Sequence, residues 1–535
     1  MFVVMSKDKF LKGAAILTIA GLIVKVMGAF GKIILARLLG AEALGLYNFA
    51  YPFYTAAISL AGAGVPAAIA IMIAEKTAMN DHYGAKRIFN ISLRVLFVFG
   101  ILLSVLMYLF AHWAIEYDIL RDDRAYWALV ALAPAILFVV MEAVFRGYFQ
   151  GLQNMKPTGM SQMFEQLFRV VFMIGMAAIL LKYGLEYGAM GASLGAAPGA
   201  VAGFVVLLVY YFNKRRNDGT LVQTHARESA FAVIKRIVIL ALPVCLTSLM
   251  LPFASGVDAV LVPYRLGVAG VDVAQSTTMF GYLVGMAVPL IAGVTVLTLS
   301  LSNSLVPAVS EARALGRIAD IRKKTSTAYH IANLITIPAF FGLWLLATPI
   351  AVTLYKEPNA GLSIAITSIG IVMLGLQNVS TGTLQGLGKT AIPFIAMLVS
   401  VIVKIVVTWI FVAIPSINIA GAAWATNCDF GVAAIINMLF IYKYTGFGIE
   451  VIKTLRIVVA SAIMGACSLG AYNLLMQLFH GRVVHSCILA MLVGGLVYIV
   501  AIFMVGGIRG EDLEALPKFG KPLAEKLRQY KIIRN

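Results

Sequence analysis

Apolar stretches of about 20 residues alternate with short polar segments along the whole chain. Because lipid offers no partner for exposed backbone groups, each stretch should cross a membrane as a helix. The pattern therefore predicts an all-α polytopic membrane protein. Its 14 expected spans are 13–38, 46–74, 88–112, 125–149, 159–181, 190–212, 235–262, 276–306, 327–348, 362–386, 391–414, 419–442, 453–475 and 484–506.

Basic residues concentrate in every second connecting segment. They precede the first span, follow the sixth at 214–216, follow the eighth at 322–324 and recur in the tail after Arg509. Cytoplasmic segments carry such an excess, so both termini should be cytoplasmic. The net charge of +18 then reflects topology and attraction to anionic lipid, and it does not indicate nucleic-acid binding.

Composition narrows the function. Of 535 residues, 61% are hydrophobic and 12% charged, about half the charged share of soluble domains. The first span carries Lys25 and Lys32 and lacks a cleavage site, so we expect a retained helix rather than a signal peptide. No phosphate-binding loop, zinc motif, nucleophile elbow or paired-cysteine motif occurs. No cofactor, metal site or catalytic residue is predicted, and the chain should not be an enzyme.

One polar phrase of the sequence, a short motif, occurs twice. FRGYFQGLQNMKP at 145–157 is echoed by GTLQGLGKTAIP at 382–393, an offset of 235 that also aligns Arg169 with Lys404. Farther on, GAS at 191–193 resembles GAA at 421–423. Such repeats are typical of transporters, with substrate sites between the repeated halves. We therefore expect two similarly oriented six-helix lobes, at 1–230 and 231–450, followed by two extra helices and a basic tail at 451–535.

Several cations fall inside predicted spans, where charge is costly and usually functional. Lys25 and Lys32 lie in the first span without an opposite charge one turn away, and they are predicted to line a water-filled cavity with Arg169 and Arg146. The last two each follow a glutamate by four residues, the favoured order for an ion pair, so the paired acids are Glu142 and Glu165. Two alternatives remain open: Arg146 extends to the interface, or Glu165 and Arg169 form a self-neutralising structural pair.

The second half offers buried acids. Asp258 lies in the seventh predicted span, and Asp429 lies beside Asn427 in the twelfth. Together with Lys404 they are candidates for ion coupling, because an intramembrane carboxylate can carry a proton or bind sodium. The alternative is that Asp429 or Asp258 simply pairs with Lys404.

Prolines and glycines interrupt three predicted spans, where broken helices would let a transporter bend. The interruptions are GAGVP at 62–66, Pro243 with Pro252, and VP at 288–289 followed by Gly293. The alternative is ordinary tolerance of these residues in membrane helices.

Five phrases resemble the stage V sporulation protein B-like group of the multidrug/oligosaccharidyl-lipid/polysaccharide (MOP) exporter superfamily, which is related to MurJ-type lipid II flippases. They are LARLLGAEALGLY (35–47), RGYFQGLQNMKPT (146–158), VDAVLVPYRL (257–266), GYLVGMAVPLI (281–291) and SLVPAVSEA (304–312). The resemblance implies 14 helices, two lobes around a central cavity, and alternating access. It also implies export of a polyprenyl-pyrophosphate-linked saccharide across the bacterial cytoplasmic membrane.

The resemblance also bears on single residues. In the MurJ type, basic residues of helix 1 line the cavity; Lys25 matches one and Lys32 matches another with a shift of one position. The ion site of that type uses an acid in helix 7, matched by Asp258, and an acid in helix 11. The eleventh span here has Lys404 and no acid. We hypothesise that its ammonium replaces sodium, leaving coupling to protons or membrane potential.

Three functions compete. The first is a flippase for lipid II or another polyprenyl-linked unit, acting as a monomer whose partners are that substrate and membrane lipids. The second is a multidrug cation antiporter of the same superfamily, which should favour acidic and aromatic cavity residues. The third, a membrane-embedded transferase, would need an acid/base or metal cluster at one membrane face, and the sequence shows none.

Overall fold

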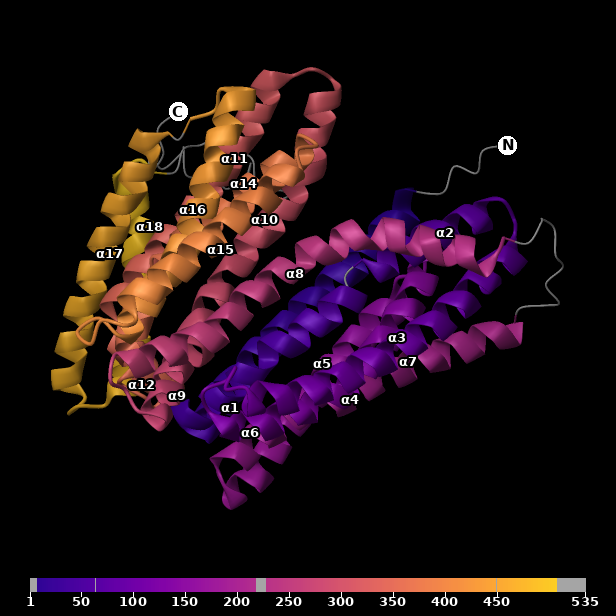
Figure 1. The fold of residues 1–535 in the computed structure, drawn as a ribbon. Coiled ribbons are helices and arrows are strands. Elements are labelled where there is room, and N and C mark those ends of the chain that lie inside the picture. The colour runs from indigo at the N-terminus through magenta and orange to yellow at the C-terminus, as the bar shows by residue number, and fades with distance from the viewer. Residues whose placement is uncertain (1–6, 63, 218–227, 449, 508–535) are drawn as a thin grey trace. The chain divides into compact units, whose positions relative to one another are not determined.

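The computed structural model describes residues 7–62, 64–217, 228–448 and 450–507, and these residues contain helices and no β-strand (Figure 1). The elements are α1 (Lys7–Gly62), α2 (Val65–Ala78), α3 (His82–Glu116), η1 (Asp123–Ala125), α4 (Tyr126–Gly151), α5 (Lys156–Leu180), η2 (Leu181–Tyr183), α6 (Leu185–Leu194), α7 (Ala196–Asn217), α8 (Ala230–Val268), α9 (Val273–Phe280), the π-helix η3 (Gly281–Ala287), α10 (Val288–Ala314), α11 (Ile318–Leu345), α12 (Ala347–Tyr355), α13 (Ala360–Thr367), α14 (Gly370–Gly386), α15 (Ala391–Phe411), α16 (Ile419–Thr445), α17 (Val451–Leu478) and α18 (Val483–Met504).

The predicted membrane fold is confirmed. Within the described residues, 13 stretches are long and apolar enough to cross a membrane, and the first, Ile16–Ala78, covers two predicted spans. These two are separated at Gly40, where the backbone leaves the helix with φ 71° and ψ −179°. That left-handed φ is accessible to glycine at little cost. Fourteen spans result, as the sequence predicts.

The contacts divide the chain into two units. Unit 1 contains the described residues up to Tyr264 together with Asp272–Gly281, and unit 2 contains Arg265–Val271 and the described residues from Tyr282 onward. This grouping assigns most of α8 to unit 1, whereas the sequence symmetry places a boundary at residue 230. The lobe boundaries at 230 and 450 remain predictions.

Helix α4 is the central helix of unit 1. In the most apolar 18-residue stretch of this span, 72% of the residues are buried. Helix α4 packs against α2, α3 and α7. Two glycines bring α4 close to α2: a Cβ on Gly147 would lie 2.8 Å from the Pro66 carbonyl oxygen, and one on Gly151 equally close to that of Ala70. Any larger residue at either glycine would push the two helices apart.

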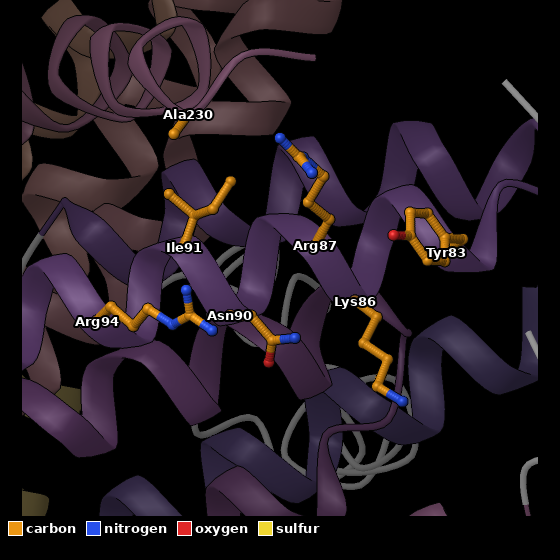
Figure 2. Close-up of a pocket in the computed structure, with 7 residues that line it drawn as sticks. All are labelled: Tyr83, Lys86, Arg87, Asn90, Ile91, Arg94 and Ala230. Atoms are coloured by element: carbon orange, nitrogen blue, oxygen red, sulfur yellow. The ribbon is translucent and has the colours of Figure 1, made fainter. Parts of the chain in front are cut away.

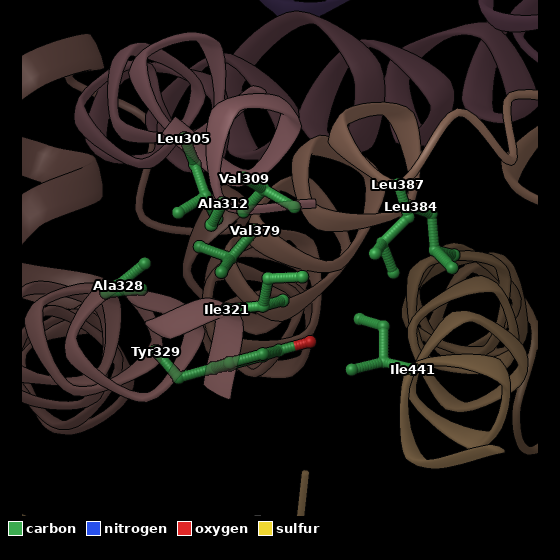
Figure 3. Close-up of a cluster of buried hydrophobic side chains, with 11 residues drawn as sticks. Leu305, Val309, Ala312, Ile321, Ala328, Tyr329, Val379, Leu384, Leu387 and Ile441 are labelled. Atoms are coloured by element: carbon green, nitrogen blue, oxygen red, sulfur yellow. The ribbon is translucent and has the colours of Figure 1, made fainter. Parts of the chain in front are cut away.

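Unit 2 repeats this arrangement around α14, which packs against α10, α11 and α16. A Cβ on Gly382 would lie 2.7 Å from the Ser302 carbonyl oxygen, and one on Gly386 would lie 2.8 Å from that of Val306. A buried apolar cluster fills the space between these four helices (Figure 3), and it includes Val309, Tyr329, Val379 and Ile441. The repeated phrase therefore occupies the same packing position in both units.

The three predicted interruptions have different outcomes. At GAGVP the helix breaks, since α1 ends at Gly62 and α2 begins at Val65. Helix α8 continues through Pro243 and Pro252 without ending. The eighth predicted span is irregular because the π-helix η3 precedes α10. The tail after Arg509 lies outside the described residues, as do residues 218–227 of the loop at 213–232 and the side chains of the first lysines.

Candidate functional site

Two lysines lie on one exposed stripe of α1. Lys25 and Lys32 are seven residues apart, which places them about 10 Å apart on the same helical face. Both are exposed on unit 1, and no ion pair engages either one among the described residues. The Lys32 ammonium lies 5.7 Å from the centre of the Tyr51 ring, within range of a cation–π attraction. These lysines therefore carry uncompensated charge.

The other predicted cations of unit 1 form a closed ion network. The two predicted pairs within helices are confirmed: Arg146 lies 2.9 Å from Glu142 on α4, and Arg169 lies 2.7 Å from Glu165 on α5. A third contact that the sequence does not show joins the helices, because Arg146 also donates to Glu165 at 2.8 Å. Two guanidinium groups and two carboxylates thus balance one another.

The side chains of this ion network are largely buried. The Glu142 side chain has no exposed surface, and Arg146 and Arg169 are only 16% and 17% exposed. Arg146 also donates to the Ser161 hydroxyl at 3.1 Å. These contacts hold the Arg146 guanidinium among α4 and α5 and disfavour the alternative in which it extends to the interface.

Small residues of α7 make room for the network. A Cβ on Gly203 would overlap Glu142 Oε1, and a Cβ on Gly199 would lie 2.8 Å from the Cβ of Arg169. Glycine at both positions lets α7 pack directly over the charged side chains. The sequence alone does not distinguish these glycines from others, because their role depends on which helix faces them.

Three tyrosines of α1 were also missed. The rings of Tyr47, Tyr51 and Tyr54 contact one another in turn in tilted arrangements, with ring centres 5.4 and 5.9 Å apart, and all three lie within electrostatic range of Arg169. Their spacing of four and three residues in YNFAYPFY was the available signal, since it places them on one helical face. Tyr51 lies beneath Lys32 as well, so the lysine stripe and the network share this side chain.

Unit 2 contains a smaller buried ion pair. The Lys404 ammonium lies 3.7 Å from Asp429 Oδ2, and the Ser400 hydroxyl donates to Asp429 Oδ1 at 2.6 Å. All three residues are buried. The predicted alternative in which Lys404 pairs with Asp429 is therefore the arrangement found.

The other two residues predicted to take part in ion coupling, Asn427 and Asp258, lie on different helices. Asn427 is buried on α16 and donates through Nδ2 to the Ile366 carbonyl oxygen at 2.7 Å, which anchors α16 to α13. Asp258 is half-buried on α8 in unit 1. No group of three or more histidine, cysteine or acidic side chains within the described ranges is arranged to hold a metal ion.

Comparison with known proteins decides the family. The profile of the polysaccharide biosynthesis protein family matches residues 10–313, more than half of the chain. The chain belongs to this family. The MatE family profile also matches, over residues 243–410.

Two curated relatives come from Bacillus subtilis (strain 168). Stage V sporulation protein B is 26% identical over 84% of this chain and 86% of the relative. Lipid II flippase MurJ is 24% identical over 86% of this chain and 87% of the relative. A solved structure of lipid II flippase MurJ in an inward closed conformation shares the fold, with a TM-score of 0.65, 15% identity, and coverage of 91% of this chain and 98% of that one.

These findings confirm the resemblance that the sequence shows. The protein is a multi-pass membrane protein of the MOP superfamily, and its homologues are transporters and flippases.

Proposed function

We propose that the protein is a flippase that exports a lipid-linked cell-wall precursor, with an undecaprenyl-pyrophosphate-linked unit such as lipid II as its substrate. The exposed, unpaired lysines of α1 are the observation that carries this proposal. Arg146 and Arg169 are balanced by Glu142 and Glu165, so Lys25 and Lys32 supply the excess positive charge of this region. A pyrophosphate group complements such charge. The relative named as a lipid II flippase supports this substrate class.

In this mechanism the two lysines bind the pyrophosphate while the polyprenyl chain remains in lipid. Their separation of about 10 Å along α1 lets one lysine engage the phosphates and the next accept them farther along the helix. Tyr51 stabilises the Lys32 side chain through its ring. The neutral network behind them fixes the packing of α4, α5 and α7 while adding no net charge.

The coupling mechanism is proposed from unit 2. Lys404 places an ammonium group beside Asp429, where a coupling cation could otherwise bind. We therefore infer that transport is driven by a proton gradient or the membrane potential rather than by sodium. Transport measured in vesicles with and without a sodium gradient decides this, and strict sodium dependence would contradict it.

The proposed setting is the bacterial cytoplasmic membrane, with both termini in the cytoplasm and the protein acting as a monomer. The concentration of basic residues in alternate loops supports this orientation. Cysteine accessibility from each side of the membrane would test it.

A multidrug cation antiporter is the second candidate, supported by the MatE match. An organic cation needs an available carboxylate, whereas Asp429, Glu142 and Glu165 are all engaged by basic side chains. The exposed lysines would repel such a substrate. Extrusion of organic cations by the reconstituted protein would favour this candidate.

A flipping assay tests the main proposal. Purified protein is reconstituted in vesicles with lipid II or another polyprenyl-pyrophosphate saccharide, and head-group exposure on the opposite leaflet is measured. Lys25→Glu should lower the initial rate by at least about tenfold, because it replaces attraction to the pyrophosphate by repulsion. Lys25→Arg, which retains the charge, should keep most of the activity.

Lys323→Glu is the matched control, since Lys323 is an exposed lysine on α11 in unit 2. It makes the same charge change outside the proposed stripe and should flip lipid II at the wild-type rate. All variants are first compared by size-exclusion chromatography. Normal flipping by folded Lys25→Glu protein would contradict the assigned binding site.

A further inference from the structure

A basic pocket lies near the beginning of α3, away from the lysine stripe of α1. Its volume is about 440 Å³, and it is lined by the α3 side chains Tyr83, Lys86, Arg87, Asn90, Ile91 and Arg94, with Ala230 at the start of α8 (Figure 2). The α3 side chains occupy successive turns of one helical face, so they can contact one ligand together. None of the residues of the proposed flipping site lines this pocket.

The pocket has uncompensated positive charge. The nearby carboxylates of Asp81 and Glu228 are engaged by Lys76, at 3.6 and 2.6 Å. Arg87 donates through Nε to the backbone oxygen of Glu228 at 3.1 Å, and this contact does not neutralise its charge. In the described part of the chain no carboxylate pairs with Lys86 or Arg94. Three cations and the Asn90 amide therefore line this cavity, and none of the residues that line it carries a carboxylate.

The position of Arg94 restricts the kind of anion. It lies 12 residues beyond His82, the first residue of α3, which is about 18 Å along the helix. The same face continues with the exposed apolar side chains of Val98, Ile101 and Val105. A charged pocket that opens onto an apolar helix face suits a ligand with an anionic head group and hydrocarbon chains.

We propose that this pocket binds the head group of an anionic phospholipid. Arg94 and Lys86 contact the phosphodiester, Asn90 donates a hydrogen bond, and the acyl chains lie along the apolar face of α3. Guanidinium groups bind phosphate oxygens with paired hydrogen bonds, and basic pockets beside membrane helices are suited to anionic lipids. This site is separate from the transported substrate and does not depend on the proposed flipping activity.

Native mass spectrometry of the full-length protein tests the proposal. Detergent-purified protein is mixed with phosphatidylglycerol or with phosphatidylcholine of the same chain length, and bound lipid is counted. Wild-type protein should retain phosphatidylglycerol preferentially, and Arg94→Gln should weaken this binding by about tenfold, as expected for loss of one charged hydrogen-bonding group. Arg94→Lys should retain part of the preference, and Lys323→Gln, outside the pocket, should retain all of it.

Competition experiments distinguish a phospholipid head group from other phosphate-containing ligands. Inorganic phosphate should not displace bound phosphatidylglycerol at equal concentration, because it lacks acyl chains; equal competition would overturn the lipid assignment. Undecaprenyl pyrophosphate is tested as a second competitor. If it displaces phosphatidylglycerol from wild-type protein and binds poorly to the Arg94→Gln variant, the pocket belongs to the transported substrate and the proposal is overturned. If Arg94→Gln does not fold, Lys86→Gln replaces it, and wild-type retention by that variant contradicts the site.

Discussion

The two units use the same packing of helices to hold different charges. At the offset of 235, Glu165 and Arg169 of unit 1 correspond to Ser400 and Lys404 of unit 2, while Glu142 and Arg146 correspond to Gln377 and Thr381. At these four aligned positions unit 1 therefore carries four charged side chains, whereas unit 2 carries one. The anion that balances Lys404 comes from another helix, because Asp429 lies on α16.

The source of this acid is explained by the second alignment. GAA at 421–423 is 230 positions after GAS at 191–193, so Asp429 corresponds to Gly199. In unit 1 the glycine lets α7 pack over Arg169, whose acid Glu165 lies on its own helix. In unit 2 the acid is Asp429 on the neighbouring helix α16, and Ser400 stands at the position that corresponds to Glu165. The two packing glycines of the repeated phrase are kept, since Gly147 and Gly151 correspond to Gly382 and Gly386, while the charged groups differ between the units.

The largest effect should follow from Arg146→Met, which tests the importance of the unit 1 network. Arg146 contacts both Glu142 and Glu165, so its loss leaves buried carboxylates uncompensated. We expect the free energy of unfolding to fall by roughly 3–5 kcal/mol. Thermal unfolding in detergent measures this. The double variant Glu142→Gln, Arg146→Met should recover part of the loss, and an unchanged melting temperature in the single variant would contradict the network.

A smaller effect is expected for Gly203→Ala, which tests the packing of α7 over the same network. The new Cβ would overlap Glu142 Oε1, so the carboxylate or the helix must shift. The expected cost is about 1–3 kcal/mol, as for other overpacked sites. Gly175→Ala in α5 is the control, because a Cβ there meets no atom within 4 Å. Equal melting temperatures for the two variants would argue against close packing at Gly203.

Lys404→Met tests the simpler pair of unit 2. Asp429 would keep its hydrogen bond from Ser400 but lose the cation beside it, and only one carboxylate is affected. The loss should therefore be smaller than for Arg146→Met, about 1–3 kcal/mol, as for one buried polar group left without a partner. A double-mutant cycle with Asp429→Asn measures the coupling between the two side chains. A loss as large as that of Arg146→Met would show that unit 2 depends on its ion pair as strongly as unit 1 depends on its network.

The smallest effect concerns Glu450, at the start of α17 in unit 2. Lys453 contacts its carboxylate at 2.6 Å and Ser326 donates to it, and these partners hold its pKa below the ordinary value of 4.5. The carboxylate therefore stabilises the fold above that pH, and the contribution is lost as pH falls through the folded-state pKa. Because this side chain is 42% exposed, Glu450→Gln should cost less than about 0.5 kcal/mol at neutral pH.

The pH dependence provides the check for Glu450. Unfolding of wild type and variant is compared at neutral pH and at a pH well below 4.5. The small difference at neutral pH should disappear in acid, where the wild-type carboxylate is protonated. A difference that persists in acid would mean that the substitution acts through packing instead.

Much of the architecture follows from local sequence. The spacing of apolar stretches predicts the helical spans, because the length of a span is set by the bilayer and its helical form by the need to satisfy backbone groups. Glutamate four residues before arginine predicts the pairs Glu142–Arg146 and Glu165–Arg169, since helical geometry alone brings such side chains together. The repeated glycine phrase predicts that two segments share one packing role. Each of these signals is contained within one helix.

Contacts between helices required the tertiary structure. The bond from Arg146 to Glu165, the match of Lys404 with Asp429 rather than another acid, and the place of Gly203 over Glu142 all depend on which helices are neighbours and how each is rotated. The basic pocket of α3 likewise becomes visible only when the start of α8 closes one side of it. The sequence by itself determined the helices and the charges they carry, because both are local properties. The tertiary structure decided which charges are neutralised and which remain available to a ligand, because that depends on distances between residues far apart in the chain.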